Sequence, residues 1–115
     1  MNSYIVGGYY SIEIRDKEYR LIKILSVNEY GLHIALYKGR FTVRPKLIIV
    51  DELSYGSPLD DQDYGMAHLP FTRELFEACD PVFIETGMVC TNELEGYRTW
   101  VKQKGSYWGK SMAVK

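Results

Sequence analysis

Apolar and polar residues alternate along much of the first half of the chain, with the two-residue period of a β-strand. Segments 9–15, 19–27 and 32–37 therefore predict three strands. The middle segment has aliphatic residues at both odd and even positions, which is typical of a strand covered on both faces. In segment 32–37 the period assigns Leu32, Ile34 and Leu36 to the core and His33, Ala35 and Tyr37 to the outward face.

Residues typical of turns separate the predicted strands. Gly31 is placed to adopt a positive φ, and Gly39 predicts a tight turn or a bulge. Further strands are expected over 46–53 and 81–85. The stretch 54–65 is rich in Gly, Pro, Ser and Asp, so it predicts the longest irregular loop.

The second half begins with a predicted strand-to-helix corner. Thr72 precedes the helical run 73–79 and has the side chain of a good N-cap. Phe71 and Phe76 occupy the two positions of a hydrophobic staple. Only His68 has no part in this corner, and it is retained as a candidate cleft residue.

The strongest helical pattern covers residues 92–105. Asn92 is the expected N-cap, and Glu95 stands three residues later at the capping-box position. Acidic residues lie near the start and basic residues near the end, as the helix dipole prefers. Gly105 supplies a stop at the end of the helix.

These elements predict an α+β fold that is mainly β. The first half resembles the architecture of a small, partly open antiparallel β-barrel of SH3-like type, followed by a short helix and a longer C-terminal helix. We expect a single domain over 1–115, with mostly strands in 1–70, helical or mixed structure in 71–105 and a tail in 106–115. A likeness of architecture implies no function.

Charge is distributed unevenly along a chain whose net charge is only -1. Residues 1–50 carry a balance of +4, residues 51–95 a balance of -10 and residues 96–115 a balance of +5. Such blocks indicate either opposed faces or ion pairing within the fold. The start of the chain has neither a basic region nor a long apolar run, so a cytoplasmic protein is expected, with Cys79 and Cys90 as reduced, inert thiols.

Few chemistries find support in the residues. The two His and two Cys lack the spacing of a zinc site, and the acidic loop does not match a calcium-binding loop. No metal, no cofactor and no catalytic residue is predicted. A small enzyme built around His68 is kept as the third functional hypothesis.

The candidate binding surface is a hairpin that interleaves aromatic and basic residues. It comprises Tyr37, Lys38, Arg40, Phe41 and Arg44, with His33 on the same outward face. The leading hypothesis is a non-enzymatic, bacterial-type binding module that recognises a protein or peptide through this hairpin. A single-stranded nucleic-acid binder is the alternative, and no membrane partner is expected.

The hairpin hypothesis depends on the exposure of Tyr37. If Tyr37 packs inside and Arg40 pairs with acids of 51–95, the charge asymmetry is internal pairing and the hairpin loses its basis as a site. The oligomeric state is left open by the sequence.

Overall fold

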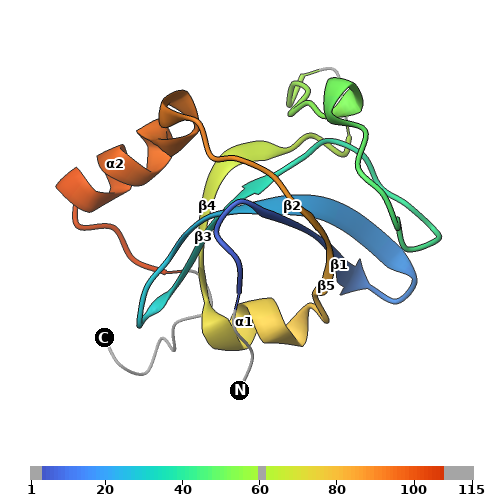
Figure 1. Ribbon diagram of the computed structural model, residues 1–115, viewed down its shortest axis with the longest axis horizontal. Coiled ribbons are helices and arrows are strands. Elements are labelled where there is room, and N and C mark those ends of the chain that lie inside the picture. Colours follow the sequence, from blue (N-terminus) through green and yellow to red (C-terminus); the bar gives the residue numbers. More distant parts are fainter. Residues whose placement is uncertain (1–3, 60–61, 108–115) are drawn as a thin grey trace.

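The computed structural model describes residues 4–59 and 62–107, and its main element is a five-stranded antiparallel sheet (Figure 1). Its strands are β1 (Gly8–Arg15), β2 (Glu18–Val27), β3 (Gly31–Leu36), β4 (Met66–Thr72) and β5 (Val82–Thr86). They lie in the order β4–β3–β2–β1–β5, so β4 and β5 are the edges and the sheet is not closed. The predicted α+β, mainly β class is confirmed.

Two α-helices and two 3₁₀ turns complete the described elements. They are η1 (Val50–Glu52), α1 (Arg73–Ala78), η2 (Thr91–Leu94) and α2 (Glu95–Lys102). Figure 1 shows α1 on one side of the curved sheet and α2 and η1 on the other. No helix in the described ranges has the length and hydropathy needed to cross a membrane.

The first face of the sheet carries the main core, which α1 closes. Its buried members are Tyr10, Ile12, Ile22, Ile24, Leu32, Ile34, Leu69, Phe71 and Phe76. The Thr72 hydroxyl accepts a hydrogen bond from the Leu75 N–H at 3.1 Å, which confirms the predicted N-cap. Phe71 and Phe76 pack in this core, as the staple positions predict.

The second face of the sheet is also covered, which corrects the expected outward face of β3. Tyr9, Leu21, Leu25, Ala35 and Tyr37 are buried there. Partly buried residues from distant segments pack over them, namely Ile48, Leu53, Tyr55, Ile84, Val89 and Leu94. The aliphatic residues on both faces of segment 19–27 predicted this cover correctly for β2.

The segment 46–53 forms no strand and contains only the η1 turn. Its apolar residues Ile48 and Leu53 pack onto the second face of the sheet instead of joining a ladder. The predicted strand is therefore wrong, because burial of apolar side chains does not require strand pairing.

Two local predictions are also corrected. Gly31 does not have a positive φ. It lies where a Cβ would stand 2.2 Å from the Phe71 carbonyl oxygen, so the position needs glycine for space. Asn92 does not cap α2, because η2 precedes the helix and the N-cap position of α2 is Leu94. The capping box belongs to η2 instead, where Glu93 accepts the Cys90 N–H at 2.7 Å.

Asp60 and Asp61 of the predicted acidic loop lie outside the described residues, as does 108–115 of the predicted tail.

Candidate functional site

The six residues of the predicted binding surface do not share one exposed face. These are His33, Tyr37, Lys38, Arg40, Phe41 and Arg44. Tyr37 is only 6% exposed and His33 is fully buried, because the second face of the sheet is covered. Lys38 is exposed and Phe41 is 36% exposed. The expected exposed tyrosine between two cations is therefore wrong.

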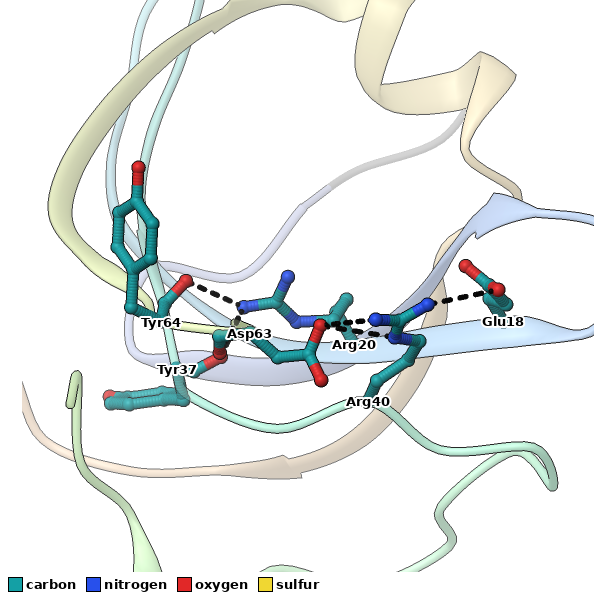
Figure 2. Close-up of polar contacts among 6 residues, drawn as sticks. All are labelled: Glu18, Arg20, Tyr37, Arg40, Asp63 and Tyr64. Carbon is teal, nitrogen blue, oxygen red and sulfur yellow. Dashed lines mark hydrogen bonds and ion pairs between the residues drawn. The ribbon is translucent and has the colours of Figure 1, made fainter. Parts of the chain in front are cut away.

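Arg40 is held by carboxylates of this chain (Figure 2). It donates to Asp63 Oδ1 through Nη2 at 2.7 Å and through Nε at 3.0 Å, and to Glu18 Oε1 through Nη1 at 3.2 Å. The neighbouring Arg20 donates through Nη2 to three backbone carbonyl oxygens, those of Tyr37, Asp63 and Tyr64. The two arginines therefore fasten the loop before β4 to the sheet.

Arg44, the last residue of the predicted binding surface, also has its guanidinium bound by other residues of the chain. Its Nη1 donates to Ser11 Oγ at 2.8 Å, and its Nη2 pairs with Asp80 Oδ2 at 3.1 Å. The guanidinium also lies 4.6 Å from the centre of the Tyr19 ring. At Arg40 and Arg44 the uneven charge along the sequence is therefore accounted for by ion pairs within the fold.

The two histidines form a hydrogen-bonded pair beneath α2, with His33 buried and His68 half-buried. His33 Nδ1 lies 2.8 Å from His68 Nε2, and His33 Nε2 lies 2.9 Å from the Tyr107 hydroxyl. Two backbone N–H groups donate to Asn28 Oδ1, so the Asn28 amide donates to the Tyr107 oxygen at 2.6 Å. The tyrosine proton is then directed to His33, which donates in turn to His68.

This pair is neutral and has no access to the cleft described below. Burial lowers the pKa of His33 from 6.5 to about 4, with a further contribution from His68. Burial also lowers the pKa of His68. Trp100 and Tyr97 of α2 cover the His33 ring, each at 4.5 Å between ring centres. The imidazoles therefore act as a hydrogen-bonded support for α2.

A cleft of about 520 Å³ lies on the second face of the sheet, and we call it the tyrosine cleft. Its floor is formed by Tyr9 of β1, Lys23 of β2 and Tyr37, which follows β3. One wall comes from residues 50–55 and the other from residues 85–93. The volume falls within the range of small-molecule and peptide side-chain sites.

A buried ion pair forms part of the floor of the tyrosine cleft. The Lys23 side chain is 5% exposed, and its Nζ lies 3.1 Å from both carboxylate oxygens of Glu93. Nζ also donates to the Met88 carbonyl oxygen and lies 5.2 Å from the centre of the Tyr9 ring. Glu93 is positioned by its contact with the Cys90 N–H, so the start of η2 supplies the counter-ion for β2.

Three tyrosine rings line the cleft, with Tyr9 and Tyr37 buried in its floor and Tyr55 half-buried. Tyr37 and Tyr55 stack at 5.5 Å and 5° between their planes, and Tyr9 lies 6.2 Å from Tyr37. Burial raises the pKa of Tyr37 and of Tyr55, and nearby tyrosines or Glu93 raise them further. The Tyr37 and Tyr55 hydroxyls therefore stay protonated and neutral at pH 7, and the Tyr37 hydroxyl is hydrogen-bonded to Tyr9.

The candidate residues of this cleft were missed in the sequence, apart from Tyr37. Lys23 carried the usable signal, because it is a cation inside a strand with aliphatic residues on both faces and must find a buried carboxylate. Glu93 could not be named as its partner, since the two are far apart in sequence. Tyr9 and Tyr55 resembled ordinary strand and loop tyrosines.

Metal and thiol chemistry find little support in the described residues. The described ranges contain no group of three or more His, Cys, Asp and Glu side chains placed to share an ion. Both cysteines are free. Cys79 is half-buried and burial raises the pKa of its thiol, as expected for an inert cysteine. Cys90 is exposed at the wall of the tyrosine cleft, so burial does not protect its thiol as it protects that of Cys79.

The tyrosine cleft is thus built by three strands, the 50–55 segment and the connection between β5 and α2. No protein-family model, curated protein or solved structure matches the chain significantly.

Proposed function

We propose that this protein is a non-enzymatic binding module whose binding site for a peptide or protein segment is the tyrosine cleft. The observation that carries the proposal is a 520 Å³ cleft lined by three tyrosines, of which Tyr55 is half-buried and Tyr9 and Tyr37 form the buried floor. Tyrosine provides a large contact area at low entropic cost and is enriched at residues that dominate binding energy. The site is therefore moved from the predicted hairpin to the face beneath the 50–55 segment.

The exposed apolar residues at both walls favour a macromolecular partner. Val50 is 63% exposed on one wall, and Met88 is 84% exposed on the other. Exposed apolar side chains beside a cleft are typical of interaction sites, and methionine adapts its shape to different partners. A peptide that enters the cleft would cover both.

The alternatives from the sequence have less support. Among the charged residues that line the cleft, Lys23 and Glu93 neutralise each other, and the two histidines lie under α2. This arrangement favours binding over acid–base catalysis. The arginines that a nucleic-acid binder would use, Arg40 and Arg44, are engaged with Asp63 and Asp80. An SH3-like barrel stays a prediction, and the proposal requires only a curved sheet.

The proposal is tested by selecting binders from a random dodecapeptide display library on the immobilised protein. We expect selected peptides to lose at least about tenfold in affinity for Tyr55→Ala, because truncating a central aromatic contact costs 2 kcal/mol or more. Tyr30→Ala is the matched control, since Tyr30 is 70% exposed and lies in the turn before β3. Peptides that bind Tyr55→Ala and the parent protein equally, or a selection that yields no binder, would contradict the proposal.

A further inference from the structure

The tyrosine cleft has no free cationic donor among its lining residues. Lys23 is the single cation that lines it. An ammonium group has three hydrogens, and Lys23 directs them to the Met88 carbonyl oxygen and to the two oxygens of Glu93. An anionic ligand would have to displace these partners, which would leave the half-buried Glu93 carboxylate uncompensated.

Acceptors, in contrast, remain available at the cleft. Glu85 is exposed on the β5 wall, and one of its oxygens accepts the Ile48 N–H at 3.3 Å. The described chain offers no partner for the other oxygen. Asp51 and Glu52 are exposed in the opposite wall segment, beside the lining residues Val50 and Leu53. Among the residues that line the cleft, Glu85 and Glu93 outnumber Lys23, so the lining carries one net negative charge.

The tyrosine rings also attract a cation. A cation is drawn to the face of a tyrosine ring by the ring quadrupole. The cleft already holds one such cation, because Lys23 Nζ lies 5.2 Å from the Tyr9 ring centre while it pairs with Glu93. Tyr55 and Glu85 also line the cleft, one from each wall, and offer a further aromatic ring and carboxylate to a ligand.

We infer that the partner segment inserts a basic side chain, with arginine favoured, into the tyrosine cleft. Its guanidinium binds the free oxygen of Glu85, and its stem and planar head pack on the Tyr55 ring, the half-buried member of the three tyrosines. Arginine suits this site better than lysine because the guanidinium is planar, stacks on aromatic faces and is more weakly hydrated. The inference rests on the proposed function and adds the chemical class of the partner.

The probes are three capped tripeptides, acetyl-Gly-X-Gly-amide, in which X is arginine, citrulline or glutamate. Citrulline has nearly the shape of arginine without its charge. Binding is followed by NMR through the amide signals of residues 50–55 and 85–93. We expect the arginine peptide to bind at least about tenfold more tightly than the citrulline peptide, to weaken with added salt, and the glutamate peptide not to bind.

Glu85→Gln removes the carboxylate that the inference singles out. It should lower the affinity for the arginine peptide about tenfold and leave that for the citrulline peptide unchanged. Glu77→Gln makes the same chemical change at an exposed position of α1, on the opposite side of the sheet, and should have no effect.

Each other outcome has a distinct meaning. Equal binding of arginine and citrulline peptides at the cleft would overturn the inference and leave the proposed function in place. Arginine binding that Glu85→Gln does not weaken would overturn the assigned contact. If none of the tripeptides and none of the library peptides shifts the cleft signals, both the inference and the proposed function fail.

Discussion

Lys23 is the residue on which the second face of the sheet depends most. Its ammonium is buried in the middle of β2 and is compensated by Glu93, which also caps η2. Removing one partner of a buried pair leaves the other charge uncompensated, which costs more than the pair contributes. We expect Lys23→Met to lower the free energy of unfolding by about 3 kcal/mol, measured by urea denaturation.

The double variant Lys23→Met, Glu93→Gln separates pairing from packing. It should recover part of the lost stability, since neither charge then remains buried alone. Lys102→Met, at an exposed position of α2, is the matched control and should change stability by less than about 0.5 kcal/mol. A single Lys23→Met variant as stable as this control would show that the pair is not buried in solution.

His33 makes the stability of the protein depend on pH. Its folded pKa of about 4 lies below the ordinary value of 6.5, so between these values the unfolded chain binds one proton more than the native protein. The contribution of His33 is therefore complete above pH 6.5 and is lost as the pH falls through 4. Between pH 7 and 4.5 this loss is roughly 2–3 kcal/mol.

The measurement is an NMR titration of the His33 ring together with urea denaturation at several pH values. The slope of the unfolding free energy against pH is set by the difference in bound protons between the unfolded and native states. In His33→Asn this difference should be smaller by about one proton over this range, while the contribution of carboxylates remains. A ring that titrates near pH 6.5 in the native protein would refute the assignment.

Gly96 sets how closely α2 approaches the sheet. A Cβ at this position would lie 2.5 Å from the His68 Cβ. In an exposed helix, Gly→Ala stabilises by ~1 kcal/mol. Here the overpacking cost of roughly 1–3 kcal/mol opposes that gain. We expect Gly96→Ala to destabilise the protein and to shift the His68 signals in NMR spectra.

The comparison for this prediction lies on the same helix. Thr99→Ala changes an exposed position of α2 and should raise stability by a few tenths of a kcal/mol through helix propensity alone. If Gly96→Ala stabilises the protein as much as or more than Thr99→Ala, the helix does not rest on β4 as described.

Elements with local signals were predicted well from the sequence. The strands β1, β2 and β3 follow the period of their apolar residues, β5 follows a short apolar run, and the Thr72 cap uses only neighbouring residues. The strand expected over 46–53 is absent, because an apolar run in the sequence indicates burial and not the type of secondary structure. The position of the cap before α2 failed because a 3₁₀ turn comes first, which the capping-box pattern does not distinguish.

The site was much less predictable, because it is made of long-range contacts. The tyrosine cleft joins residues of β1 and β2 to residues 50–55 and 85–93. No spacing in the sequence brings these segments together. The hairpin failed as an exposed surface for the same reason, since acids far along the chain occupy its arginines and distant apolar segments cover Tyr37.

The two cysteines lie on opposite faces of the sheet, so the reactivity of each thiol measures the exposure of its own face. Cys79 packs against the first core, and Cys90 is exposed at the tyrosine cleft. We expect a thiol reagent at neutral pH to modify Cys90 well before Cys79. A peptide bound in the cleft should slow the labelling of Cys90 and leave Cys79 unchanged, which mass spectrometry of tryptic fragments can measure. Equal rates for both thiols would contradict the placement of Cys90.

The strand order also determines when the cleft can form during folding. β1, β2 and β3 are consecutive hairpins and pair through short turns, whereas β4 joins one edge after a long connection and β5 returns to the other. Contacts between residues close in sequence form before those that close long loops. The three-stranded meander is therefore the expected nucleus, and both walls of the cleft arrive later. Mutations in β2 should slow folding, while mutations in the walls should mainly speed unfolding.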